Sequence, residues 1–137
     1  MRSQKDRLVI DTNLWISFLL TKDLSRLDSI ISQSKVTLVF SAQLLEELIE
    51  VTQRSKFRKY FSLKDVETLL LYIRERTDLI SVKTDVAVCR DPKDNFLLAL
   101  AFDGKASHLI TGDKDLLILK KFGRTKILTI SEYLSHH

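Results

Sequence analysis

Runs of branched and aromatic apolar residues recur along the chain and alternate with segments of helical periodicity. Such runs predict buried strands, because these residue types favour the packed surface of a sheet. The predicted strands cover residues 8–10, 36–40, 79–82, 109–111 and 126–130. Strands that alternate with helices are typical of a parallel sheet with helices on both faces. We therefore expect an α/β fold with a central parallel sheet of four to five strands.

The segments between these strands show the spacing of apolar positions that predicts amphipathic helices. The predicted helices cover residues 12–20, 24–32, about 42–54, a segment that begins after Ser62, 96–102 and 116–120. Side chains that can cap a helix N-terminus stand at several of the expected starts, namely Ser41, Ser62, Asp91 and Ser131. Residues 57–61 are expected to form a basic and aromatic connection. The segment 96–102 is apolar on every side and should be buried centrally.

Composition narrows the class of protein. The 137 residues suffice for one compact domain, residues 1–137, with a sizeable core. Cys89 is the only cysteine, which excludes an internal disulfide or a thiolate metal site and indicates a reducing compartment. No signal peptide precedes Asp11, and no apolar run approaches the roughly 20 residues that cross a bilayer. We therefore expect a cytoplasmic protein without membrane association.

The formal net charge of +4 permits a polyanionic partner without requiring one. Basic residues gather in a cluster at residues 54–59 and in a second cluster, which comprises Lys114, Lys120, Lys121, Arg124 and Lys126. Each cluster is either a solvated face or a surface that steers nucleic acid. The candidates for contact with nucleic acid are Arg54, Lys56, Arg58 and Lys114.

Asp11 and Asp113 are the strongest pair of candidate site residues, because each follows an apolar strand. In a parallel sheet the carboxyl ends of the strands meet at one edge, which is where such folds bind ligands. If the two strands are neighbours, their backbones lie about 4.8 Å apart. Two carboxylates that close repel one another unless one is protonated or a cation bridges them. The alternative is that each acid only caps the helix that follows it.

Helices bring further acids toward this edge. Glu47 borders the apolar face of its helix, whereas Glu46 and Glu50 lie farther round, so Glu47 is the glutamate best placed to point inward. Asp94 opens a helix that is otherwise apolar, and the helix dipole alone would also favour an acid there. Asp91 is explained by capping, so we rank Asp94 above it and expect Asp91 in a supporting position.

Asp115 is a further candidate, two residues beyond Asp113 and next to Lys114. Acids without a histidine or thiolate partner suit a hard cation with oxygen ligands, such as Mg²⁺ or Mn²⁺. Such a cation, held by a few carboxylates and the phosphates of a substrate, serves phosphodiester hydrolysis. The sequence leaves open whether one metal ion or two would bind.

Together these residues resemble a known family. The resemblance rests on Val9-Ile10-Asp11-Thr12-Asn13, the Glu47 helix after Ser41, Arg90-Asp91-Pro92-Lys93-Asp94-Asn95 and Ile110-Thr111-Gly112-Asp113-Lys114-Asp115-Leu116-Leu117. These blocks are similar, in order and spacing, to the PIN domain family. The likeness is greatest to its bacterial and archaeal VapC-like branch, described as toxins of toxin–antitoxin pairs.

The resemblance implies a three-layer α/β/α sandwich and a Mg²⁺- or Mn²⁺-dependent ribonuclease. It implies that the catalytic and metal-binding acids are Asp11, Glu47, Asp94 and Asp113, with Asp115 matching an acid found in part of the family. Asn13 and Thr111 match polar positions that orient ligands or water near the metal. The resemblance also implies an RNA substrate, a homodimer and a cognate antitoxin protein.

Two alternatives stay open at this point. One is an RNA- or partner-binding module that keeps the acids for structure and acts through its basic clusters. The other is a phosphatase of the haloacid dehalogenase type, which also places an aspartate after its first strand. That family has its general acid two residues after the nucleophile, where this chain has Asn13, and the chain is short for that fold.

Overall fold

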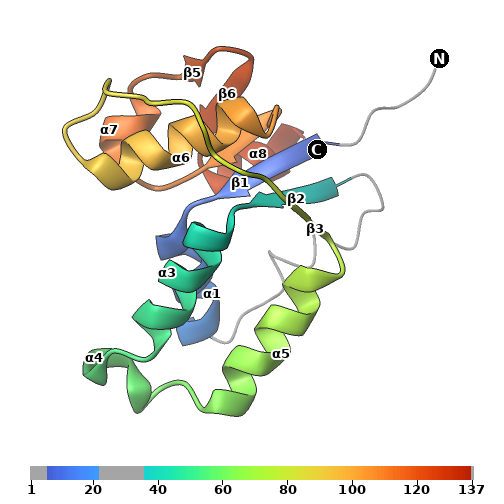
Figure 1. Ribbon diagram of the computed structural model, residues 1–137, viewed down its shortest axis with the longest axis vertical. Coiled ribbons are helices and arrows are strands. Elements are labelled where there is room, and N and C mark those ends of the chain that lie inside the picture. Colours follow the sequence, from blue (N-terminus) through green and yellow to red (C-terminus); the bar gives the residue numbers. More distant parts are fainter. Residues whose placement is uncertain (1–5, 22–35, 137) are drawn as a thin grey trace.

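The strands of the protein form one six-stranded sheet in the order β3–β2–β1–β4–β6–β5 (Figure 1). The computed structural model describes residues 6–21 and 36–136. The strands are β1 Asp6–Ile10, β2 Val36–Phe40, β3 Thr77–Leu79, β4 His108–Ile110, β5 Lys121–Phe122 and β6 Thr125–Leu128. All neighbouring strands pair in parallel except β5, which runs antiparallel to β6. The predicted α/β class and parallel sheet are confirmed, but the sheet has six strands rather than four to five, and one edge is antiparallel.

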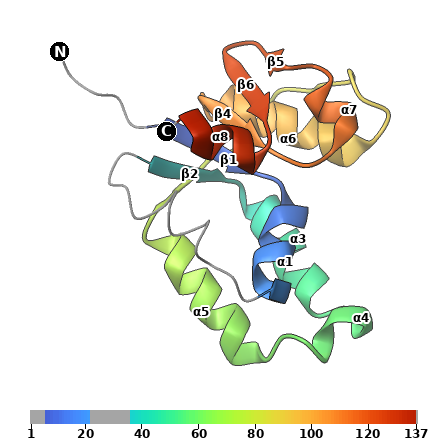
Figure 2. The same ribbon diagram turned by 180° about the vertical axis from the view of Figure 1, so that it is seen from behind.

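Helices flank both faces of this sheet. They are α1 Thr12–Thr21, α3 Ala42–Thr52, α4 Ser55–Arg58, α5 Leu63–Arg74, α6 Pro92–Asp103, α7 Lys114–Leu117 and α8 Ile130–His136. Helix α6 packs against β1, β2 and β4 on one face, and α8 lies on the opposite face, as Figures 1 and 2 show. Helices α1 and α3 pack against each other beyond the carboxyl ends of β1 and β2. The helix predicted at residues 24–32 lies outside the described residues.

One part of the core lies between α6 and the middle of the sheet, and another part extends among α1, α3 and α5. Leu8, Val9 and Ile10 of β1 are buried, as expected for a strand covered on both faces. Leu98 and Leu100 of α6 are fully buried against them, so the expected central burial of this helix is confirmed for most of its length. The exception is Phe102 near its end, whose side chain is 53% exposed.

The connection between β3 and α6 differs from the prediction. The strand predicted at 79–82 ends at Leu79, and the Ile80 amide donates one further bond to the Phe40 carbonyl at 2.7 Å. The chain then leaves the sheet, because Asp103 of α6 accepts hydrogen bonds from the Lys83 amide and from the amide and hydroxyl of Thr84. The bonds from Thr84 and Lys83 hold the pKa of Asp103 below its usual value. A carboxylate that binds these amides thus fixes the path of the connection.

The caps of α3 and α5 agree with the prediction. The hydroxyl of Ser41 accepts from the Leu44 amide, and Ser62 and Asp65 form a capping box. Helix α3 ends at Thr52, slightly before the expected 54. The 57–61 segment was expected to be a connection only, but the structure has the short helix α4 at Ser55–Arg58.

The last part of the chain departs most from the prediction. Gly123 has a φ of +58°, in the left-handed region that favours glycine, and turns β5 into β6 as a hairpin that was not predicted. Thr129, rather than Ser131, caps α8: its hydroxyl accepts from the Glu132 amide at 3.1 Å, and its own amide donates to the Glu132 carboxylate at 3.0 Å. This capping box ends β6 at Leu128, short of the predicted 130.

Two smaller corrections concern β4 and α7. Strand β4 covers His108–Ile110, one residue earlier than predicted, and α7 covers Lys114–Leu117 rather than 116–120. The carboxylate of Asp113 accepts from the Asp115 amide and so starts α7 early. Within the described part of the chain, no helix is both long and apolar enough to cross a membrane.

Candidate functional site

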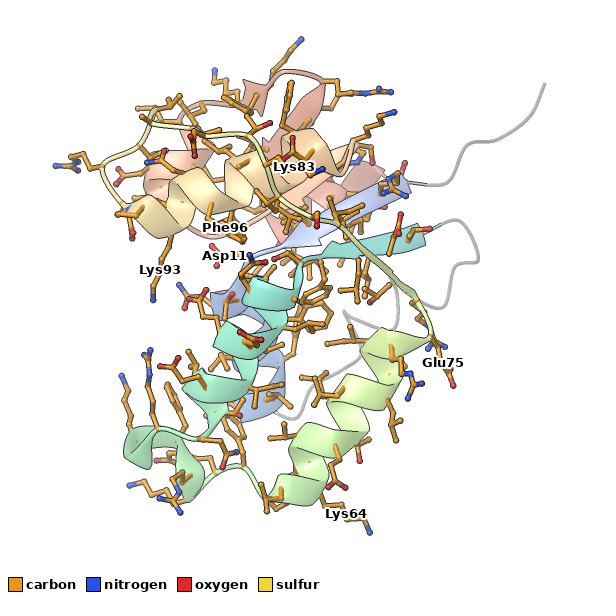
Figure 3. The ribbon with its side chains drawn as sticks, viewed as in Figure 1. Asp11, Lys64, Glu75, Lys83, Lys93 and Phe96 are labelled. Atoms are coloured by element: carbon orange, nitrogen blue, oxygen red, sulfur yellow. The ribbon has the colours of Figure 1, made fainter. Side chains whose placement is uncertain are left out.

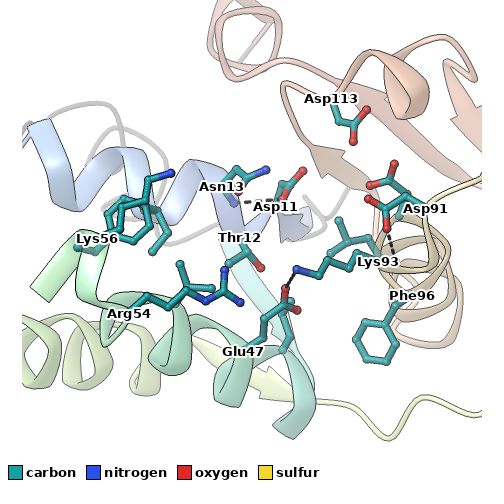
Figure 4. A pocket seen from close by; sticks show the side chains of 16 residues that line it. Asp11, Thr12, Asn13, Glu47, Arg54, Lys56, Asp91, Lys93, Phe96 and Asp113 are labelled. Atoms are coloured by element: carbon teal, nitrogen blue, oxygen red, sulfur yellow. Dashed lines mark hydrogen bonds and ion pairs between the residues drawn. The ribbon is translucent and has the colours of Figure 1, made fainter.

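A pocket of about 320 Å³ opens at the carboxyl ends of β1 and β4 (Figure 4). Segments far apart in the sequence line it: the start of α1, one face of α3, the α3–α4 connection, the start of α6 and Asp113. Figure 3 shows Asp11 where α3 meets the sheet, with Lys93 and Phe96 of α6 beside it. This is the edge of the sheet at which the sequence predicted the acids to meet.

Asp11 follows β1 directly, and its side chain is buried. Its Oδ2 atom accepts from the Thr111 hydroxyl at 2.8 Å, and its Oδ1 atom accepts from the Asn13 amide at 3.2 Å. Burial raises the pKa of Asp11, with further contributions from the negative charges of Asp113 and Glu47, while the two hydrogen bonds oppose the rise. The two hydrogen bonds therefore hold the carboxylate in one orientation, and its pKa depends on the charges of the other acids in the pocket.

Thr111 connects Asp11 to Asp113. Its hydroxyl donates to Asp11 and accepts from the Asp113 amide at 3.0 Å. The carboxylate of Asp113 also caps α7 by accepting from the Asp115 amide at 2.8 Å. Asp113 therefore caps the helix that follows it and also lines the pocket, so capping does not by itself account for its position.

Asp94 is the most buried of the acids contributed by a helix, at 4% exposure. Its Oδ2 atom is enclosed and has no hydrogen-bond partner among the described residues. Burial is the main cause that raises its pKa to about 7, and the adjacent carboxyl group of Asp113 and the negative charges of Asp91 and Asp11 add to it. Leaving a carboxylate oxygen buried without a donor is costly unless a proton or a cation satisfies it.

Asp94, Asp113 and Asp115 offer carboxylate oxygens that all lie within 4.8 Å of one another. Such a set of oxygen donors, with one unsatisfied buried atom among them, fits a hard divalent cation. The guanidinium of Arg90 lies 3.6 Å from Asp115 Oδ2 but is highly exposed, so solvent screens its charge. Asp91 is exposed, lines the pocket and caps α6 by accepting from the Lys93 amide.

Glu47 also lines the pocket, as its position on α3 predicted, but it does not join the cluster of three aspartates. Its Oε1 atom lies 3.2 Å from the ammonium of Lys93, which reaches across from α6 (Figure 4). The Glu47 side chain is 28% exposed, so this ion pair is partly screened by solvent. Lys93 was not predicted as a site residue, although its place between Asp91 and Asp94 could have indicated it.

The basic residues predicted to contact nucleic acid divide into two groups. Arg54 and Lys56 line the pocket beside Phe57, and the Lys56 ammonium lies 5.2 Å from the centre of the Phe57 ring. Arg58 and Lys114 are exposed and lie outside the pocket lining. The aromatic walls, Phe57 and Phe96, were not predicted as site residues, because Phe57 was assigned to a basic and aromatic connection and Phe96 to a centrally buried helix.

Comparison with known proteins agrees with this geometry. Residues 7–115 match the PIN domain family. The chain belongs to the PIN domain family. It is also 32% identical, over 123 residues, to an uncharacterized protein of the archaeon Methanocaldococcus jannaschii, an alignment that covers 88% of this chain and 79% of that protein. PIN domains are generally metal-dependent nucleases that typically use a divalent metal, and this member has a partly buried acidic cluster.

The raised pKa of Asp94 predicts how the stability of this PIN domain depends on pH. Because the folded state binds this proton more tightly than the unfolded state, whose pKa is near 3.8, the contribution is fully present below pH 4 and is lost as the pH rises through about 7. In EDTA, the free energy of unfolding should therefore fall from pH 5 to pH 8 more steeply for the wild type than for Asp94→Asn. Chemical denaturation at each pH measures both. Parallel pH profiles for the two proteins would contradict the prediction.

Proposed function

We propose that this PIN domain protein is a metal-dependent endoribonuclease, with Asp11, Glu47, Asp94 and Asp113 as its catalytic acids. The observation that supports the proposal most is the unsatisfied, buried Oδ2 atom of Asp94, whose carboxyl group lies close to that of Asp113. A carboxylate kept in this state without a functional reason would only destabilise the fold. The match to a family of nucleases favours this interpretation over the phosphatase alternative.

In this proposal Asp94, Asp113 and Asp115 hold Mg²⁺ or Mn²⁺, with Asp11 beside them. When bound, the cation would lower the pKa of a water molecule and stabilise the negative charge on the leaving oxygen. Thr111 orients Asp11 by a hydrogen bond and fixes the backbone of Asp113, so that both acids are positioned before substrate arrives. Glu47 and its ion pair with Lys93 place one negative and one positive charge at the wall formed by α3 and α6.

The wall of the pocket formed by α4 and the residues before it has the charge to bind an RNA substrate. Arg54 and Lys56 line it with positive charge, so we propose that they bind phosphates of an RNA strand whose scissile bond lies at the acids. Phe57 on this wall and Phe96 on the α6 wall add aromatic surface on which bases can stack (Figure 4). Arg58 and Lys114, outside the pocket, would contact RNA only beyond it.

Metal removal tests the proposed activity. The purified protein should cleave a 5′-labelled RNA in Mn²⁺ or Mg²⁺, lose all cleavage in excess EDTA and recover it when the metal is restored. Asp113→Asn should be inactive, whereas Glu46→Gln, an exposed neighbour of Glu47 that lies outside the pocket lining, should cleave like the wild type. Cleavage that persists in EDTA would contradict the proposal, and metal-independent binding without cleavage would support the RNA-binding module instead.

We further propose that the protein is the toxin of a toxin–antitoxin pair and acts as a homodimer. The support is the likeness of its motifs to the toxin branch of the PIN domain family. Induced expression should arrest growth, and co-expression of a small protein encoded next to it should relieve the arrest. Light scattering of the purified protein measures its oligomeric state. Normal growth under high expression of an active enzyme would contradict the toxin role.

A further inference from the structure

The second basic cluster lies on the antiparallel edge of the sheet, away from the pocket. The residues of this basic edge are Lys120, Lys121, Arg124 and Lys126, which are all exposed. The stretch between Asp115 and Glu132 contains no acidic residue that could neutralise them locally. Figures 1 and 2 show the β5–β6 hairpin at the outer rim of the molecule, next to α7. Helix α7 carries Lys114 and so connects the basic edge to the acids at the mouth of the pocket.

Two lysines of the basic edge oppose each other directly. Lys121 and Lys126 are register partners in the β5–β6 pair, so their side chains leave the same face of the hairpin. Like charges in this arrangement destabilise a hairpin. Neither lysine forms an ion pair with any residue that the structure describes, although other lysines and arginines of the chain do. The fold therefore carries an unneutralised concentration of positive charge at a free strand edge.

The other face of the same hairpin presents aromatic surface. Phe122 packs edge to face against Phe102, with ring centres 6.4 Å apart, and Phe102 is half exposed. Gly123 forms the turn beside this ring: a Cβ atom there would make only an ordinary contact, 3.6 Å from the Phe102 Cδ1 atom, so it is the positive φ that favours glycine. The hairpin thus has unpaired cations on one face and the exposed Phe102 ring beside the other, and nucleic-acid strands are bound by such cations through phosphate contacts and by such rings through stacking.

We propose that the basic edge binds the sugar–phosphate backbone of RNA at a distance from the scissile bond. The proposal rests on the proposed nuclease function and adds a substrate requirement to it: the RNA must be long enough to reach from the pocket past Lys114 to the hairpin. Strand β6 alone spans roughly 10 Å, so a short oligonucleotide in the pocket leaves the basic edge empty. The positive charge and the exposed ring of Phe102 favour RNA over an acidic protein segment as the occupant.

The experiment compares RNA lengths in EDTA, where binding is read without cleavage. Fluorescence anisotropy gives the affinities of the wild type and of Lys121→Glu for a single-stranded 20-mer and for a tetranucleotide. We expect Lys121→Glu to weaken binding of the 20-mer about tenfold and to lower the slope of log affinity against log salt by about 0.7 or more. Binding of the tetranucleotide should stay unchanged.

The same variant controls for folding. The carboxylate that Lys121→Glu introduces would face Lys126 as an opposite charge, so the melting temperature should stay level or rise while RNA affinity falls. Lys64→Glu makes the same change of charge at the start of α5, far from the hairpin (Figure 3), and should bind the 20-mer like the wild type.

Unchanged affinity of Lys121→Glu for the 20-mer, or an equal loss in Lys64→Glu, overturns the proposal. So does a loss of binding to a polyglutamate peptide without a loss of binding to RNA, since this would assign the basic edge to an acidic protein. A failure of the nuclease proposal is seen separately, as an intact 20-mer after incubation of the wild type with Mn²⁺.

Discussion

Asp94→Asn should reduce RNA cleavage by on the order of 10²- to 10³-fold or more, because the proposed metal site loses several kcal/mol of charge stabilisation. The amide keeps the size of the side chain but brings an NH₂ donor into a place that holds an unsatisfied carboxylate oxygen. The folded protein should persist, since the substitution removes a buried negative charge beside Asp113. Single-turnover cleavage in Mn²⁺, with circular dichroism of the same samples, measures both effects.

The matched control is Asp91→Asn, three residues earlier at the start of the same helix. Asparagine caps a helix about as well as aspartate, and Asp91 is exposed, so this variant should keep activity within roughly tenfold of the wild type. Wild-type cleavage by Asp94→Asn would remove Asp94 from the proposed site. If both variants lost RNA cleavage equally, the loss would be due to the reduced negative charge at the start of α6 and not to the Asp94 carboxylate in particular.

Leu98→Ala should strongly destabilise the protein, because Leu98 is one of the fully buried residues of α6. Leu98 is fully buried where α6 crosses the middle of the sheet, so the shorter side chain leaves a cavity that its neighbours cannot fill completely. The expected cost is about 3 kcal/mol, which lowers the melting temperature by roughly 10 °C. Urea denaturation in EDTA measures the free energy of unfolding without any contribution from metal.

Leu71→Ala provides the comparison, because Leu71 lies on α5 and is 61% exposed. The substitution removes the same atoms from a side chain that packs little, and alanine favours helix. The free energy of unfolding should therefore change by no more than about 0.5 kcal/mol. Similar losses for the two variants would mean that α6 is not the central packing element of the sheet.

The strands β1 and β2 could be predicted from the sequence because their signal is local. Each ends in three consecutive apolar residues that are buried, the pattern of a strand in a sheet covered on both faces. The β5–β6 hairpin could not be predicted in this way. Its first strand has two residues, one of them a lysine, and its existence depends on the left-handed Gly123 and on pairing with a strand that is already in the sheet. Thr129 was missed as a cap because a threonine after branched residues also continues a strand.

For the site, the sequence could predict which acids reach the pocket but not how their side chains are paired. Backbone position decides that Asp11, Glu47, Asp94 and Asp113 line it. Which of these side chains contact one another depends on their rotamers and on neighbours from other elements. Glu47 pairs with Lys93, while Asp115 joins Asp94 and Asp113 in the compact cluster. These contacts cross between α3, α6 and α7, so no local spacing in the sequence contains them.

The sheet order has a consequence for the timing of synthesis. Strand β1 is made first but lies between β2 and β4, and the amide of Asp11 is bound by the carbonyl of Ile110. A chain still on the ribosome can therefore not complete its acidic pocket until β4, and β6 beside it, have emerged. At ordinary rates of translation this delay is on the order of ten seconds. If the proposed cleavage of RNA holds, the nascent chain thus stays inactive until these strands have emerged and β4 has paired with β1.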